Sequence, residues 1–119
     1  MYEIESFEDL DNFIIENYEN NKVILLYFGS SWCGPCKILK KKLADEDSIT
    51  QMPKLQVCYI DIDKNEEISD TYKVKVLPTQ IFVKLCDDKV KIFSKIEGYD
   101  YTKLVLEYKK YIEKVLNNI

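Results

Sequence analysis

The stretch that decides the fold is VILLYFGSSWCGPCK, which runs from Val23 to Lys37. Its first six residues, 23–28, are all hydrophobic, and the run is too short for a typical helix and rich in strand formers. Such a run predicts a β-strand that is buried on both faces. A strand buried in this way needs helices above and below its sheet, so the stretch predicts an α/β protein.

The rest of the chain alternates between helix and strand patterns around this strand. Ser6 and Asp9 form a capping pair, and hydrophobic residues at helical spacing continue to about residue 19. Asp87 and Asp88 mark a turn between two strand-like segments, which predicts a hairpin, and Asp100 can cap a last helix. The expected elements are a short strand at 2–4, helices at 6–19, 33–45, 66–73 and 100–116, and strands at 23–28, 55–62, 79–85 and 90–96.

This order of elements predicts a three-layer α/β/α sandwich with a central mixed β-sheet flanked by four helices. The length of 119 residues and a hydrophobic content of 46% suit one domain, residues 1–119, with its own core. In the second helix, Ile38, Leu39 and Leu43 are expected to face the core and the lysines to face solvent.

The charged residues exclude several kinds of chemistry. The net charge is −4, all 17 basic residues are lysines, and the chain has no histidine. Cys–His and Ser–His nucleophilic pairs, metal sites with histidine and bidentate arginine recognition of phosphate are therefore impossible. The acidic balance also argues against a nucleic-acid partner.

No segment of the chain has the pattern of a targeting or membrane-spanning sequence. There is no stretch of about 18 uncharged apolar residues, and residues 1–5 lack a basic region followed by an apolar one. We expect a soluble protein with no membrane partner, and the cytoplasm is the default compartment.

The second half of the deciding stretch carries the chemistry. Cys33 lies directly after the buried strand and opens a helix, where free backbone N–H groups favour a thiolate. Cys36 lies one helical turn later on the same face, within reach for a disulfide and more shielded. Pro35 suits the first helical turn, Gly34 lets another backbone approach, and Trp32 supplies an apolar wall.

Two other interpretations of the cysteine pair stay open at this point. Zinc needs four ligands, and the remaining cysteines, Cys58 and Cys86, are far apart and have no second C-x-x-C or histidine beside them. A static disulfide that closes so short a loop would constrain the unfolded chain little. We therefore predict no metal and no cofactor, and interpret Cys58 and Cys86 as small apolar residues.

Nearly the whole chain resembles the thioredoxin family. The resemblance rests on Trp32-Cys33-Gly34-Pro35-Cys36-Lys37 after an apolar strand, on Leu77-Pro78-Thr79 about forty residues later, and on Gly98. It implies a thioredoxin fold and a reductant, because oxidising relatives usually carry a histidine before the second cysteine.

The same resemblance implies further site residues. Pro78 should follow a cis peptide bond and face the cysteines, Leu77 should pair with an extended substrate segment, and Gly98 should line the same groove. Asp63 should accept a hydrogen bond from the Trp32 indole. Lys37 would support the active site as the last residue of the motif.

Two departures from the family concern proton transfer. Relatives usually carry a buried acid at the position of Tyr27 and often a lysine at the position of Tyr59. That acid is thought to exchange a proton with the second cysteine. Asp61 is the substitute that the sequence offers.

The expected activity is protein-disulfide reduction through a reversible Cys33–Cys36 dithiol/disulfide, as part of electron transport and cell redox homeostasis. The expected partners are disulfide-containing proteins and a recycling reductase, since no nucleotide-binding loop is present, and the protein should be a monomer. The alternatives are a secretory-type disulfide oxidase or isomerase and a thioredoxin-fold binding or redox-sensing module.

Overall fold

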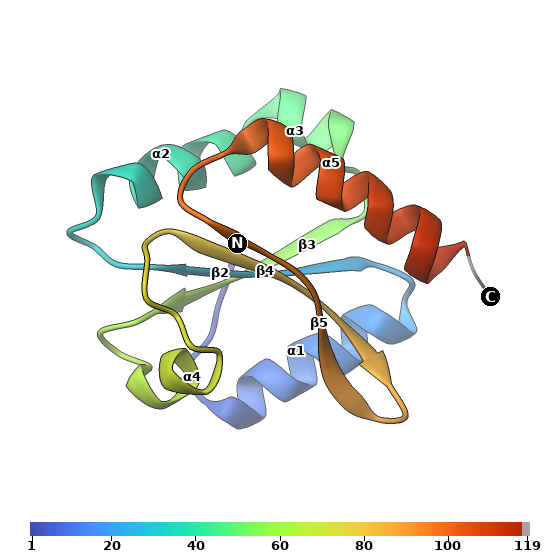
Figure 1. The fold of residues 1–119 in the computed structure, drawn as a ribbon, viewed down its shortest axis with the longest axis horizontal. Helices are drawn as coiled ribbons and strands as arrows, with labels where there is room; N and C mark the ends of the chain where they lie inside the picture. Colours follow the sequence, from blue (N-terminus) through green and yellow to red (C-terminus); the bar gives the residue numbers. More distant parts are fainter. Residues whose placement is uncertain (118–119) are drawn as a thin grey trace.

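The computed structural model describes residues 1–117, and within them five helices surround a five-stranded sheet (Figure 1). The sheet has the strand order β1-β3-β2-β4-β5. Strands β1, β3 and β2 are parallel, whereas β4 is antiparallel to β2 and to β5, so the sheet is mixed. The strands are β1 (Tyr2–Glu3), β2 (Val23–Gly29), β3 (Leu55–Asp61), β4 (Thr79–Cys86) and β5 (Lys89–Glu97).

The helices form one layer on each face of the sheet. In Figure 1, α2, α3 and α5 lie above the sheet and α1 and α4 lie below it. The three-layer sandwich that the sequence predicted is confirmed. The helices are α1 (Phe7–Glu19), α2 (Gly34–Leu43), α3 (Glu46–Gln51), α4 (Glu66–Thr71) and α5 (Tyr101–Tyr111), and α5 continues as the π-helical turn η1 (Ile112–Leu116).

Three helix starts are capped by side-chain oxygens. The Ser6 hydroxyl accepts a hydrogen bond from the Asp9 N–H, and the Asp100 carboxylate accepts one from Lys103, as the two predicted caps require. Asp45 caps α3 in the same way through the Ser48 N–H. The sequence prediction of four helices was wrong in this region, because it continued α2 to residue 45 and did not include α3.

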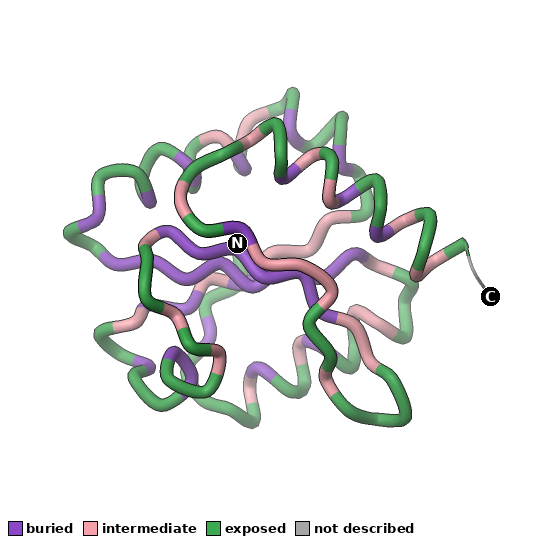
Figure 2. Tube along the Cα trace, in the orientation of Figure 1, coloured by how far each residue is buried: buried purple, intermediate pink, exposed green. Residues whose placement is uncertain are grey.

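Strand β2 separates two hydrophobic cores. All seven of its residues are buried (Figure 2). Their side chains alternate between the two faces of the sheet. The α2/α5 core contains Leu25, Tyr27 and Cys36, and the α1/α4 core contains Leu26 and Phe28. Strand β2 is therefore covered on both faces up to the loop that leads to α2.

The orientation of α2 differs from the sequence prediction at one residue. Leu39 and Leu43 face the α2/α5 core as predicted, but Ile38 is 58% exposed. Cys36, Leu39 and Leu43 are spaced by three and four residues and occupy the inner face of the helix. Ile38 lies two residues from Cys36 and therefore points away.

The β4–β5 hairpin ends in a tight turn. Asp87 and Asp88 both have positive φ values, 53° and 62°. Aspartate adopts this left-handed conformation more readily than most residues, and two consecutive residues of this kind suit the twist of a hairpin. The predicted turn is confirmed. Within residues 1–117, no helix is long and apolar enough to span a bilayer.

Candidate active site

Cys33 and Cys36 form a disulfide at the start of α2, after the loop that follows β2. Their Cα atoms are 5.3 Å apart, within the range of ordinary disulfides. Cys33 is the N-cap of α2 with extended backbone dihedrals, and Cys36 lies in the first turn of the helix. The buried strand and the helix start therefore hold the two sulfurs together.

The start of α2 provides a favourable environment for a negative charge on Cys33. The Cys33 sulfur accepts a hydrogen bond from the Cys36 backbone N–H at 3.2 Å. Pro35 lies in the first turn and has no N–H group that would need a partner. In the reduced state, this N–H and the positive end of the helix dipole stabilise the Cys33 thiolate.

The two cysteines have similar exposure, but each lines a different surface hollow. Cys33 is 6% exposed and Cys36 is 2% exposed, so both are buried in the disulfide form. Cys33 lines one surface hollow, here called the Trp32 groove. Cys36 lines another, here called the Asp61 cavity.

The Trp32 groove has a volume of about 460 Å³ and a mostly apolar wall. Trp32, which is 67% exposed, and Leu77 form part of it, and the resemblance implies substrate binding for both. Sequence reasoning missed three of the lining residues, of which Val74 and Lys75 lie two to three residues before Leu77. The lining residues are Trp32, Cys33, Gly34, Pro35, Ile62, Val74, Lys75 and Leu77.

The loop opposite the cysteines has the predicted cis peptide bond between Leu77 and Pro78. Gly98 lies beside it, because the Gly98 N–H donates a hydrogen bond to the Pro78 carbonyl at 2.7 Å. Gly98 has a φ of +87°, which favours glycine. Pro78 and Gly98 are therefore next to the groove without being among its lining residues.

Trp32 is anchored from the other side. Its indole N–H donates to the Asp63 carboxylate at 2.9 Å, as the resemblance predicted.

Lys37, the last residue of the motif, lines the Asp61 cavity and not the Trp32 groove.

Two tyrosines surround the Cys36 side of the disulfide. The Tyr27 hydroxyl donates to the Cys36 carbonyl, and the rings of Tyr27 and Tyr59 meet edge to face. Burial raises the pKa of Tyr27 above its ordinary value and raises the pKa of Tyr59 to about 12. Both phenols are therefore neutral at physiological pH.

Gly29 makes room for this arrangement. A Cβ atom at Gly29 would lie 2.9 Å from the Tyr27 ring, 3.0 Å from the Tyr59 ring and 3.3 Å from the Cys36 sulfur. The sulfur and both rings therefore pack directly against the backbone of β2.

The other two cysteines are free and differ in exposure. Cys58 is fully buried in the α1/α4 core, and this burial raises the pKa of its thiol. Cys86 is exposed at the end of β4. Cys58 is thus a core residue, as predicted.

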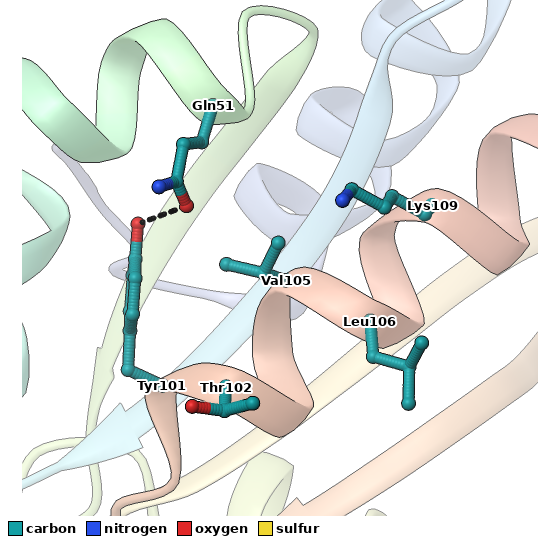
Figure 3. A pocket seen from close by; sticks show the side chains of 6 residues that line it. All are labelled: Gln51, Tyr101, Thr102, Val105, Leu106 and Lys109. Carbon is teal, nitrogen blue, oxygen red and sulfur yellow. Dashed lines mark hydrogen bonds between the residues drawn. The ribbon is translucent and has the colours of Figure 1, made fainter.

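A further groove lies between α3 and α5 (Figure 3). The Tyr101 hydroxyl donates to the Gln51 side-chain carbonyl at 3.3 Å, and Val105, Leu106 and Lys109 form much of the rest. Its lining has no thiol and no carboxylate, so redox chemistry belongs to the disulfide.

The five-stranded mixed sheet with helices on both faces is shared with solved thioredoxins. The sequence profile of the thioredoxin family matches residues 5–110. Thioredoxin-T from Drosophila melanogaster is 34% identical over 84 residues, 71% of this chain, and thioredoxin from Chlamydia pneumoniae is also 34% identical over 84 residues, 71% of this chain and 76% of its own length. The crystal structure of Fasciola hepatica thioredoxin is 30% identical, covers 92% of this chain and 98% of its own, and superposes with a TM-score of 0.77.

This chain belongs to the thioredoxin family. It spans about half the length of Thioredoxin-T, since the match covers 52% of that protein.

Proposed function

We propose that the protein reduces disulfide bonds in other proteins, with Cys33 as the attacking thiolate and Cys36 as the resolving thiol. The observation that carries this proposal is the position of Cys33. Its sulfur accepts the Cys36 N–H at the start of α2 and lines the Trp32 groove, whereas Cys36 lies on the other side of the disulfide.

Reduction proceeds in two exchange steps. The Cys33 thiolate attacks one sulfur of the substrate disulfide, a mixed disulfide forms, and the other substrate sulfur leaves as a thiolate. Cys36 then loses its proton and attacks the Cys33 sulfur. The Cys33–Cys36 bond forms, the second substrate thiolate leaves, and two electrons have passed to the substrate.

The Trp32 groove suits an extended peptide that carries the target disulfide. Trp32 and Leu77 supply apolar contact area beside Cys33, and the cis bond before Pro78 leaves the Leu77 backbone groups free to pair with a peptide strand. A dedicated reductase or a small dithiol would restore the dithiol form.

The test is the reduction of insulin by dithiothreitol, followed as turbidity. The protein should accelerate precipitation, and the Cys33→Ser variant should not. A redox titration should give a potential near that of thioredoxin, about −270 mV, and not near the value of about −180 mV of protein disulfide isomerase. If the protein does not accelerate insulin precipitation, the result would favour a thioredoxin-fold binding module. A potential of about −180 mV would indicate an oxidase or isomerase.

A further inference from the structure

The resolving step needs a proton acceptor for Cys36, and this inference rests on the proposed function. A thiol must become a thiolate before it attacks a disulfide. Cys36 is only 2% exposed, so little of its surface meets bulk solvent directly. The Asp61 cavity, with a volume of about 430 Å³, is the described hollow that Cys36 lines.

Asp61 lies on the same face of the sheet as the Cys36 sulfur. Asp61 pairs with Gly29 in the parallel register of β2 and β3, and the sulfur packs over Gly29. Tyr59, two residues earlier on β3, faces the α2/α5 core that contains Cys36, and the period of two places Asp61 on that side as well. The carboxylate therefore lies one strand away from the sulfur.

The Asp61 side chain is buried but keeps capacity to accept a hydrogen bond. Asp61 is 7% exposed, and its Oδ1 accepts the Asp63 backbone N–H at 2.9 Å. Carboxylate oxygens have further lone pairs, and Oδ2 has no donor among the described residues. Asp61 lines the same cavity as Cys36, so Oδ2 is available to a donor held there.

Ser30 provides an independent sign that the cavity holds water. Ser30 is 2% exposed, lines the cavity, and its hydroxyl has no hydrogen-bond partner among the described residues. Buried hydroxyls are nearly always paired with protein or ordered water. A water takes about 30 Å³, so the cavity has room for several.

We propose that Asp61 accepts the Cys36 proton through water held beside Ser30. In this step the Cys36 S–H bond breaks, its proton passes along the water to the Asp61 carboxylate, and the electron pair stays on sulfur. The Cys36 thiolate then forms the bond to Cys33 and releases the substrate thiolate. Asp61 afterwards returns its proton to solvent or to that thiolate, so Asp61 itself is not consumed.

The other titratable groups that line the cavity are poorer acceptors. Tyr27 and Tyr59 are neutral phenols, because burial raises the pKa of each. Lys37 and Lys40 carry ammonium groups, which only donate. Glu3 is the other carboxylate, but its side chain is 55% exposed and lies 3.9 Å from the Lys64 ammonium group.

The test separates attack from resolution in one experiment. Reduced protein is mixed with one equivalent of dithionitrobenzoate in a stopped-flow spectrometer, where attack by Cys33 releases the first thionitrobenzoate and resolution by Cys36 releases the second. All variants carry Cys86→Ser, since Cys86 is an exposed thiol that would also react. Cys58 stays unreactive because it is fully buried.

Asp61→Asn keeps an oxygen for the Asp63 N–H but removes the proton acceptor. It should leave the first phase unchanged and slow the second about tenfold at pH 7, at the low end of general base effects. The difference should shrink toward pH 9, where hydroxide replaces the carboxylate. Ser30→Ala should slow the second phase less, with the same pH trend.

Glu3→Gln is the matched control, because it removes the other carboxylate and should change neither phase. An Asp61→Asn protein with a wild-type second phase, or an equal loss in Glu3→Gln, would overturn the proposal. If Asp61→Asn fails to fold, an unchanged second phase in Ser30→Ala overturns it. A wild-type protein without a first phase would instead refute the proposed reductase function.

Discussion

The two sulfurs of one disulfide face hollows that are lined by different side chains. The Trp32 groove has an exposed indole and aliphatic side chains, whereas the Asp61 cavity has two tyrosines, two serines, two lysines and a buried carboxylate. The groove suits the contact area of a peptide, and the cavity suits the movement of a proton. In the proposed mechanism, substrate contact and proton transfer are therefore divided between the two sides of the Cys33-Gly34-Pro35-Cys36 motif.

The largest expected effect separates the roles of the two sulfurs. Cys33→Ser should abolish disulfide reduction, because the serine hydroxyl is not a nucleophile at neutral pH without a base. Cys36→Ser should retain attack and accumulate mixed disulfides with its targets. Mass spectrometry of trapped complexes checks both, and trapping that requires Cys36 but survives the loss of Cys33 would reverse the assignment.

Gly29 tests how tightly the Cys36 side is packed. Gly29→Ala should lower the free energy of unfolding by about 1–3 kcal/mol, since its Cβ would lie 2.9–3.0 Å from two tyrosine rings. Gly34→Ala, on the groove side, should change it by less than about 0.5 kcal/mol, because no atom lies within 4 Å of the new Cβ. Urea titrations of both variants measure the difference, and equal losses would show that the packing around Cys36 relaxes.

Tyr27 tests whether the cavity side positions Cys36. Tyr27→Phe removes the donor to the Cys36 carbonyl and should lower stability by about 1 kcal/mol. Tyr111→Phe removes a similar buried bond, from the Tyr111 hydroxyl to the Val83 carbonyl at 2.7 Å, and should cost about as much.

The rate at which Cys36 resolves the mixed disulfide distinguishes these two variants. In the stopped-flow assay, Tyr27→Phe alone should slow the second phase, because the Tyr111 hydroxyl donates to Val83 on β4 and not to the disulfide segment. A second phase that slows equally in both would show that the effect follows stability and not position.

The smallest expected effect is on the groove side. Trp32→Phe removes the hydrogen bond to Asp63 but keeps an aromatic ring beside Cys33. An exposed hydrogen bond of about 0.5 kcal/mol corresponds to roughly a twofold slower first phase. The second phase should be unaffected, and a change confined to the second phase would contradict the division between the two hollows.

The elements with strong patterns could be predicted from the sequence. The buried run in β2, the caps Ser6 and Asp100 and the Asp87-Asp88 turn each carry a local signal, and the structure has all of them. Helix α3 has a capping residue, Asp45, but no run of buried hydrophobic residues, because only Ser48 of its six residues is buried. Its Asp45 cap was interpreted as the end of the preceding helix.

The site could be predicted in part. The cysteine pair and the bond between Trp32 and Asp63 follow from motif spacing and family resemblance. The placement of Asp61 against Cys36 depends on the register between β2 and β3 and on the missing side chain of Gly29. A single sequence gives no register between strands, so Asp61 was only a candidate substitute for the family's buried acid.

The β4–β5 turn has a consequence for protein engineering. Asp87 and Asp88 form the hairpin tip, and in Figure 1 this tip lies at the opposite end of the molecule from the start of α2. Exposed turns far from a core are the sites where domain insertions succeed most often. A recognition peptide spliced between these two residues would be displayed away from the disulfide, which makes the chain a scaffold that can be directed to a chosen target while it stays redox-active.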